Sequence, residues 1–257
     1  MALSGSKKAL LWGAFFIVCL LNTAALADSC SLPDIGERVV SSRVIDGDTL
    51  ELVDGRRVRL IGVNTPEIGR RGAPSEPYAQ KARSELQRLV GKTGLRLLVG
   101  EDARDNYGRT LGHLFDAQGA NIEAQLLRQG LGFAVGIPPN VTLLDCHLQQ
   151  ERQARRQRLG VWQQAPVKRA AEVSQGGFQL IRGCIVTVQT QGRHIWVELD
   201  GPLVLRLPVD LPGAAGIASW RGRELEVRGW VVDRGSSRRG HKRFMLPLLE
   251  WRLAHLE

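Results

Sequence analysis

Two carboxylates stand one residue apart near the start of the first apolar region of the chain. Asp46 and Asp48 flank Gly47 directly after a run of alternating apolar residues, which predicts a turn at the end of a strand. Paired carboxylates at such a turn suit a hard divalent cation. Because Asp-Gly-Asp is also common in ordinary polar turns, the motif indicates a cation site only in combination with its neighbours.

Further polar side chains follow on the next predicted strand and at its exit. Arg59 interrupts an apolar run, so alternation along the strand separates it from its immediate apolar neighbours. Such an arginine either pairs with carboxylates of the protein or receives a phosphate. Beyond it, Pro66 restricts Thr65 to extended backbone and would aim Glu67 in a fixed direction. A proline-containing loop with a solvated glutamate is an equal alternative.

A third motif, Asp105–Arg109, is a charged turn that opens another apolar run. By itself it is equally consistent with a surface turn that contains a local ion pair. Together with the other motifs it supplies a second guanidinium. Forked guanidiniums beside a divalent ion would suit a phosphate ligand.

The elements that must position these side chains form a predicted small barrel closed by helices. Asp54-Gly55 between two apolar runs predicts a hairpin with a type I′ turn, which needs positive φ at both central residues. Glu151 precedes Arg155 by four residues, a spacing that supports an ion pair on a helix. The expected strands lie within 39–63, 95–99 and 110–115, and the expected helices at about 77–91, 121–130 and 143–159.

The composition changes around Pro166 and Gly176-Gly177, in a polar stretch that predicts a linker. Beyond it, five short strand patterns with glycine-rich turns suit a small closed barrel of the OB type. The fold class is therefore α+β, mainly β: a barrel with three helices, then a small all-β domain. The predicted boundaries are 38–163 for the first domain, 164–177 for the linker and 178–257 for the second domain.

The second domain contains two features that suit nucleic acid. Three tryptophans, Trp196, Trp220 and Trp230, could stack on bases, although core positions are the commoner place for such residues. Five basic residues also lie within ten positions that contain no acid, and they could contact phosphates or form a solvated hairpin tip. These five are Arg234, Arg238, Arg239, Lys242 and Arg243.

The first 27 residues have the three-part pattern of a secretory signal peptide. Lys7 and Lys8 precede an apolar run that is short for a membrane span, which needs about 20 residues, and a small-x-small cleavage site ends at Ala27. We therefore expect a secreted or periplasmic protein, with an uncleaved anchor as the alternative. The net charge of +9 favours a polyanionic partner, either nucleic acid or an anionic membrane, but does not specify chemistry.

Export implies an oxidising compartment, in which disulfides persist. Removal of the signal peptide leaves Cys30, Cys146 and Cys184, which allow one internal pair out of three possibilities. We expect Cys30 to pair with Cys146 because both belong to the predicted first domain. The chain has no C-x-x-C spacing, which argues against a zinc site.

The motifs resemble those of the staphylococcal nuclease family in order and interval: Asp-Gly-Asp-Thr from Asp46, the arginine strand leading to Thr65-Pro66-Glu67, and Asp105–Arg109. Further similarity lies at 128–131 and in the last predicted helix through Trp162. The resemblance covers 38–162. It implies a five-stranded OB barrel with three helices and calcium-dependent hydrolysis of DNA and RNA. A catalytically weak or inactive nucleic-acid-binding scaffold is the alternative, because some members of the family have lost catalysis.

The resemblance also implies a role for each residue. Asp48, Asn64 and the Thr65 carbonyl would ligate Ca²⁺, with Asp46 behind them. Glu67 would hold the attacking water, and Arg59 and Arg109 would grip the phosphate. The family usually has a carboxylate at the position of Asn64, so weaker calcium binding is expected here. The family's tyrosines after the second helix are absent from Phe133–Pro138, so base stacking there should differ.

Overall fold

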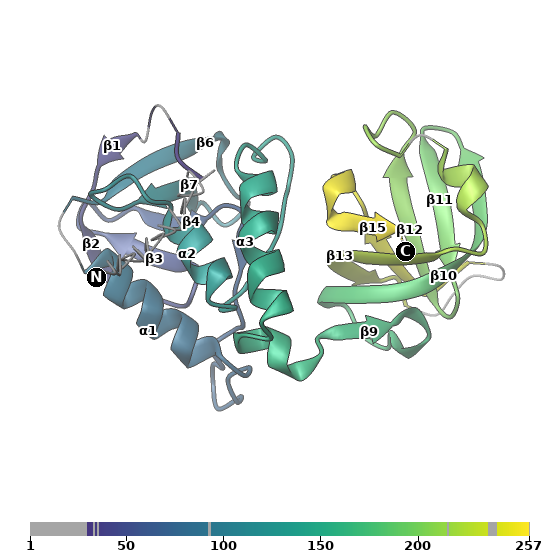
Figure 1. The fold of residues 1–257 in the computed structure, drawn as a ribbon, viewed down its shortest axis with the longest axis horizontal. Helices are drawn as coiled ribbons and strands as arrows, with labels where there is room; N and C mark the ends of the chain where they lie inside the picture. Colours follow the sequence, from purple (N-terminus) through teal and green to yellow (C-terminus); the bar gives the residue numbers. More distant parts are fainter. Residues whose placement is uncertain are drawn as a thin grey trace, which may run out of the picture.

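The computed structural model describes residues 30–32, 34, 36–91, 94–214, 216–235 and 241–256. The predicted signal peptide, residues 1–27, lies outside these residues. Figure 1 shows two β-rich parts of the chain with the helix α3 (Leu144–Arg156) at their junction. Within the described ranges, no helix is both long enough and apolar enough to cross a membrane.

The first part is a five-stranded barrel. Its sheet has the order β1-β6-β7-β4-β3-β2, in which β4 and β7 are parallel. β1 runs on into β2 along the chain and pairs with β6, so the sheet closes on itself. The strands are β1 (Glu37–Arg38), β2 (Ser41–Val44), β3 (Thr49–Leu52), β4 (Arg57–Leu60), β6 (Arg96–Arg104) and β7 (Thr110–Phe115).

The predicted hairpin at Asp54-Gly55 forms between β3 and β4, but the prediction of a type I′ turn was wrong. Gly55 has a φ of 86°, whereas Asp54 is not among the residues with positive φ. The N–H of Leu52 donates to the Arg56 carbonyl across three intervening residues. Only the last of these three needs left-handed backbone, so this is a three-residue loop in which glycine occupies the left-handed position.

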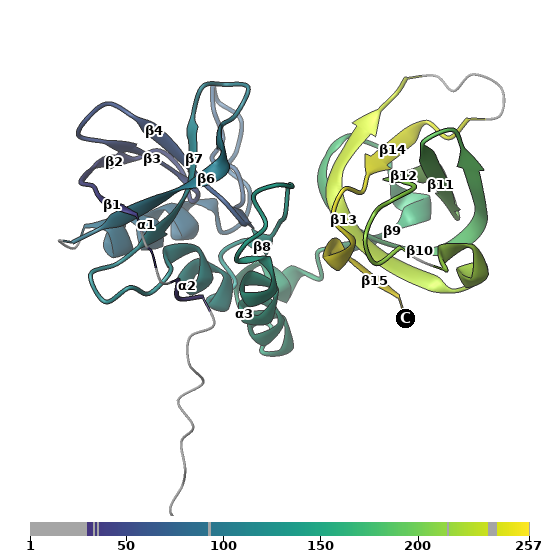
Figure 2. The ribbon, with the colours of Figure 1, turned by 90° about the horizontal axis from the view of Figure 1, so that it is seen from above.

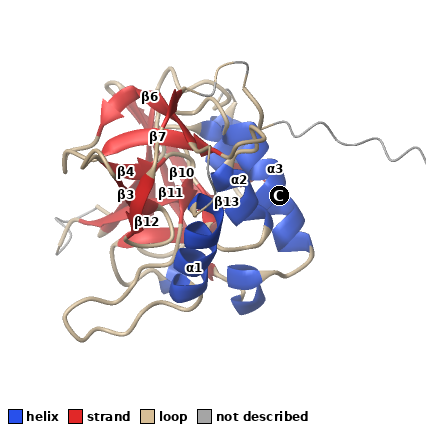
Figure 3. Ribbon diagram, turned by 90° about the vertical axis from the view of Figure 1, so that its left-hand side faces the viewer, coloured by secondary structure: helices blue, strands red, loops and turns tan. Residues whose placement is uncertain are grey.

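Three helices cover one side of the first barrel, as Figure 3 shows. They are α1 (Ala79–Val90), α2 (Ile122–Arg128) and α3. The predicted cap of α2 is confirmed, because the Asn121 side chain accepts a hydrogen bond of 2.8 Å from the Ala124 N–H. α1 begins two residues after Pro77, since Tyr78 stands before it with a φ of 70°. The predicted Cys30–Cys146 disulfide is also present.

The second part is also a closed barrel with the strand order that defines an OB fold, which confirms the predicted fold class. Its strands follow the order β10-β11-β12-β14-β13, and β13 pairs back with β10. The additional strands β9 and β15 pair with β10 and β13, so part of the predicted linker belongs to this sheet. The strands are β9 (Val167–Arg169), β10 (Gly177–Gln191), β11 (His194–Leu199), β12 (Leu203–Pro208), β13 (Glu224–Asp233), β14 (Phe244–Pro247) and β15 (Ala254–Leu256).

Buried ion pairs join the two barrels. Viewed from above, β13 lies on the side of the second barrel that faces the first (Figure 2). Arg228 on β13 contacts the Glu151 carboxylate on α3 at 2.5 and 2.6 Å, and both side chains are at least nine-tenths buried. Glu226 on β13 pairs with Arg155 and Arg182. Glu151 and Arg155, expected to support each other on the surface of α3, therefore both bind β13.

Candidate active site

A cavity of about 1150 Å³ opens beside the β2–β3 turn, the strand β4 and the start of α1. Most of the residues that the sequence singled out line this cavity, although they are spread over more than sixty positions of the chain. Barrel closure brings them together, because β4 pairs with both β3 and β7. The predicted residues that line it are Asp46, Asp48, Arg59, Asn64, Glu67 and Arg109.

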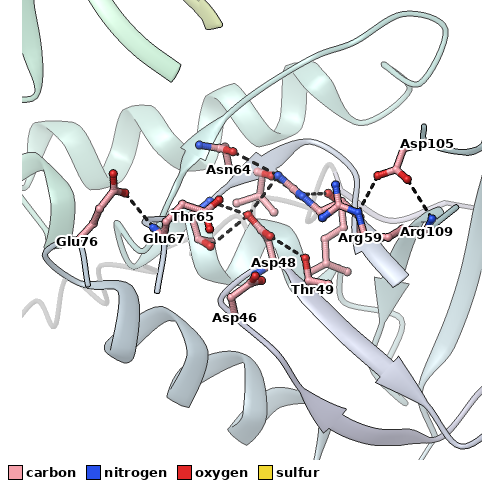
Figure 4. A network of polar contacts seen from close by, with 12 residues as sticks. Asp46, Asp48, Thr49, Arg59, Asn64, Thr65, Glu67, Glu76, Asp105 and Arg109 are labelled. Carbon is pink, nitrogen blue, oxygen red and sulfur yellow. Dashed lines mark hydrogen bonds and ion pairs between the residues drawn. The ribbon is translucent and has the colours of Figure 1, made fainter. Parts of the chain in front are cut away.

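Asp48 is the centre of the polar network in Figure 4. One of its carboxylate oxygens accepts hydrogen bonds from the Thr65 N–H at 2.9 Å and from the Thr65 hydroxyl at 3.1 Å. The same oxygen lies 3.2 Å from the Arg59 guanidinium. The other oxygen accepts from the Thr49 hydroxyl at 3.1 Å. Asp48 is only 5% exposed, so these contacts hold a buried carboxylate in one orientation.

Asp46 lies beside Asp48 and is also buried. Burial raises its pKa, and the neighbouring Asp48 charge raises it further, to about 6. The nearest cation is the Arg70 guanidinium, 3.8 Å from an Asp46 oxygen and mostly exposed. Asp48 is paired with Arg59, but among the described residues Asp46 has only this exposed guanidinium nearby, so the two carboxylates together retain negative charge that attracts a cation.

The side-chain atoms that could ligate a metal at this charge are all oxygens, which suits a hard divalent ion. Asp46 and Asp48 supply carboxylates, and Asn64 supplies an amide oxygen on the wall of the same cavity. In the part of the chain that the structure describes, no three His, Cys, Asp or Glu side chains converge on one point. A cation held here would therefore depend on two acids and on neutral oxygens, which lowers the charge of the site.

Arg59 is fixed before any substrate arrives. Its guanidinium donates to the Leu60 carbonyl at 2.6 Å, to the Val63 carbonyl at 2.8 Å and to the Asn64 amide oxygen at 3.3 Å. The side chain is 15% exposed. The sequence left two alternatives open, an internal pair or a phosphate contact. The structure gives Arg59 the internal pair with Asp48 and also places it on the cavity wall.

Glu67 reaches the cavity from the loop after β5 (Val63–Asn64). The backbone of this loop is held at both ends, since the Glu67 N–H donates to the Glu76 carboxylate at 2.9 Å and the Glu76 N–H donates to the Glu67 carbonyl at 2.9 Å. Partial burial, and then the charge of Asp48, raise the pKa of Glu67. A raised pKa makes a carboxylate a better proton acceptor near neutral pH.

Arg109 stands at the entry to β7 and lines both the first cavity and a neighbouring one of about 450 Å³. Asp105 accepts from its side chain at 2.7 Å and from its backbone N–H at 2.9 Å. The local pair that the sequence suggested is therefore present. The guanidinium remains partly exposed and lies 5.5 Å from the Tyr107 ring centre, so the pair orients Arg109 without removing it from the cleft.

The sequence reasoning missed several basic residues of the cleft. Arg57 is two positions from Arg59 on β4, so strand alternation could have assigned both to one face. Arg83 comes from α1, and only the packing of that helix reveals its position. The sequence identified Trp230 as a candidate for base stacking but did not predict its position at this cavity, because Trp230 belongs to the second barrel. The missed basic residues on the cavity wall are Arg43, Arg57, Arg70 and Arg83.

The predicted basic loop of the second barrel lines neither cavity in its described residues. Arg243 pairs with Asp233 at 2.7 Å. The Lys242 ammonium donates to the Gly201 carbonyl at 2.6 Å, and Arg234 donates to the Lys242 carbonyl. Two members of the predicted loop, residues 238 and 239, lie outside the described residues. A phosphate-binding role for this loop stays a prediction.

Comparison with known proteins places the chain in a family. Residues 57–164 match the family described as "Staphylococcal nuclease homologue". The chain is 34% identical to the thermonuclease of Staphylococcus intermedius over half of this chain and 77% of that protein. It is 32% identical to the micrococcal nuclease of Shigella flexneri over 47% of this chain and 70% of that protein. Endonuclease YncB of Bacillus subtilis is 30% identical over 57% and 68%.

The family match and the relatives named as nucleases and endonucleases define the class of this protein as a phosphodiester-hydrolysing endonuclease. The chain belongs to the staphylococcal nuclease family, and it is a nuclease. The family match ends at residue 164, before the strands of the second barrel begin. It contains Arg59, Glu67 and Arg109, whereas Asp46 and Asp48 precede it.

Proposed function

We propose that this protein is an exported, calcium-dependent nuclease that hydrolyses phosphodiester bonds of DNA, RNA or both by attack of a water molecule. The single observation that carries the proposal is the convergence of Asp48, Arg59, Glu67 and Arg109 on one cavity. The coarser conclusion, a nuclease with nucleic acid as its substrate, follows from the family. The metal, the compartment and the role of each residue are the proposed part.

The calcium site would consist of Asp48, Asn64 and the Thr65 carbonyl, with Asp46 supporting Asp48 from behind. Support comes from the oxygen-only set of possible ligands and from the position of Asp46, which is buried beside the Asp48 carboxylate. When bound, the ion would neutralise phosphate charge as a Lewis acid. The N–H and hydroxyl of Thr65 donate to Asp48, so the orientation of this carboxylate is fixed before an ion binds.

Arg59 and Arg109 are proposed to bind the phosphate oxygens. Both guanidiniums are oriented by carboxylates, Arg59 by Asp48 and Arg109 by Asp105. Preorganised donors of this kind stabilise transition-state charge without reorganising during the reaction. Glu67 is proposed to take a proton from the attacking water as the new phosphorus–oxygen bond forms. The bond to the leaving oxygen then breaks, and the Arg109 guanidinium stabilises the negative charge on that oxygen.

Export is proposed from the signal-peptide pattern of residues 1–27 and is supported by the Cys30–Cys146 disulfide. Disulfides persist in secreted and periplasmic proteins and are rare in the cytosol. Extracellular calcium would also offset the weaker binding expected from Asn64. Sequencing the N-terminus of the exported protein tests this part: Asp28 is expected, and Met1 would contradict it.

Nicking of supercoiled plasmid DNA tests the catalytic proposal. The wild-type protein should nick the plasmid with millimolar calcium and stop in EDTA. Glu67→Gln and Arg59→Ala should each lower the rate by about 10²–10³-fold, because each removes a group that acts in the transition state. Circular dichroism should show an unchanged fold.

Glu101→Gln is the matched control, because Glu101 is an exposed glutamate of the same barrel that does not line the cavity. Its rate should equal that of the wild type. Wild-type rates in Glu67→Gln and Arg59→Ala would remove the mechanism. DNA binding without any cleavage at millimolar calcium would favour a scaffold instead.

A further inference from the structure

Trp230 belongs to the second barrel, yet it lines both cavities of the first barrel. It lies on β13 and is 39% exposed, which is high for a residue of its size. The other residues common to both cavities are Arg59, Tyr107 and Arg109. The indole therefore shares the walls of both cavities with the two guanidiniums to which the proposed function assigns the phosphate.

The strand β13 holds Trp230 in this position. Side chains two residues apart on a strand share a face, so Glu226, Arg228 and Trp230 all point the same way. The first two are fixed by arginine–carboxylate contacts with α3, namely Glu226 with Arg155 and Arg228 with Glu151. Trp230, the next residue on that face, therefore lies on the face of β13 that docks on the first barrel.

An aromatic neighbour supports the indole from its own barrel. Phe178 on β10 is the direct cross-strand partner of Trp230, and their rings pack edge to face with centres 5.1 Å apart. Phe178 in turn lies 5.7 Å from the ring of Phe133 in the first barrel. Such pairs add stability beyond the area they bury, so they restrict the rotamer of Trp230. Its exposed surface is thus held still beside the cleft.

The smaller cavity combines this indole with apolar and amide groups. Its wall includes the half-exposed Ile137 and the side chain of Asn106, in addition to Trp230. A flat aromatic surface next to hydrogen-bonding groups is the environment that an unpaired nucleobase requires. The base faces of a duplex are covered by their neighbours, whereas those of a single strand are available to an indole.

We propose that Trp230 is a base-stacking residue of the substrate cleft, so that the second barrel completes a subsite for an unpaired nucleobase next to the phosphate at Arg59 and Arg109. This inference rests on the proposed function for the position of the phosphate. It accounts for an exposed tryptophan at this point, and it gives the second barrel a direct part in substrate recognition. The substrate class that it favours is single-stranded nucleic acid.

Oligonucleotide binding tests this subsite separately from catalysis. The experiment uses the full chain with Glu67→Gln, in EDTA, and measures fluorescence anisotropy of a short single-stranded oligodeoxynucleotide. A second oligonucleotide has the same length and backbone but abasic sites in place of bases. Adding Trp230→Ala should weaken binding of the natural strand by about 5- to 150-fold and leave the abasic strand unchanged. Trp230→Phe should retain part of the affinity.

Trp196→Ala is the matched control, because Trp196 is a partly buried tryptophan of the same barrel that lines neither cavity. It should bind both strands as the parent does. An equal loss for both strands in Trp230→Ala would assign the residue a structural or backbone role and overturn the proposal, as would no loss at all. Failure of the proposed catalysis would appear only in the plasmid assay, so the two failures are distinguishable.

Discussion

The two barrels share one connectivity but differ in chemistry. In each, the third strand pairs in parallel with the fifth, and the fourth pairs back to the first. The turn between the first two strands contains Asp46 and Asp48 in one barrel and Gly192 and Arg193 in the other. Arg59 pairs with the second residue of β7, whereas the residue paired with the second residue of β14 is the buried Val204.

The shared strand order therefore fixes the scaffold, and the residues in one turn and at one strand position distinguish the barrel with the cleft from the other barrel. The first barrel has buried charges at those places, where Asp48 pairs with Arg59. The second fills the equivalent strand position with an apolar side chain. Its own buried charges lie on β13, where they bind the first barrel.

The largest effect is expected at the contact between the barrels. Arg228→Ala leaves the Glu151 carboxylate buried, although the Ala134 N–H still donates to it. Removing one partner of a buried pair costs about 3–5 kcal/mol, which for this size lowers Tm by about 6–20 °C. Differential scanning calorimetry measures it. If the two barrels were merely adjacent, the melting temperature would not change.

A double variant distinguishes the loss of the ion pair itself from the cost of leaving one buried charge without a partner. Replacing both residues with neutral ones, in Arg228→Met with Glu151→Gln, should restore most of the lost stability, because no buried charge is then left alone and the Gln oxygen can still accept from the Ala134 N–H. A melting temperature as low as that of Arg228→Ala would show that shape, rather than charge, holds the barrels together.

Much of this fold was predictable because its signals are local. Alternating apolar residues gave the strands, and the Asn121 cap gave the start of α2. The turn at Asp54 was misjudged because Asp-Gly suits both two- and three-residue loops, and the choice depends on hydrogen bonds that the sequence does not contain. The residues that line the cleft were predictable where a single sequence motif contains several of them.

The docking of the barrels was not predictable, because it depends on surfaces that meet only after folding. Glu151 and Arg155 have the spacing of a surface pair, and nothing in that spacing indicates that Arg228 and Glu226 bind them. For the same reason, Trp230 could be named as an aromatic candidate but not placed at the site. Such positions depend on contacts between residues far apart in the chain, and the local patterns of one sequence do not indicate which of these residues meet.

The pH dependence of stability tests the second ion pair of the docking contact. Burial alone would raise the pKa of Glu226, but hydrogen bonds from Arg155 and Arg182 lower it to about 2, below the ordinary value of 4.5. The stabilisation is therefore complete above pH 4.5 and disappears as the pH falls toward 2. Glu226→Gln should lower Tm near neutral pH, and its difference from the wild type should shrink over that range.

Melting curves between pH 2 and pH 8 measure this difference. Glu224→Gln, at the start of the same strand, is the control and should follow the wild type throughout. A difference between Glu226→Gln and the wild type that stayed constant down to pH 2 would show that the glutamate acts through packing rather than through its charge.

The smallest effect is expected from the charge of the proposed calcium site in the first barrel. Asn64→Asp adds one negative charge beside Asp48, and ligand charge tunes calcium affinity. The calcium concentration for half-maximal nicking should fall by about tenfold, which corresponds to about 1.4 kcal/mol. Asn106→Asp adds the same charge on the wall of the smaller cavity and should leave that concentration nearly unchanged. Equal shifts in both variants would mean that general electrostatic attraction, not ligation at position 64, sets the calcium requirement.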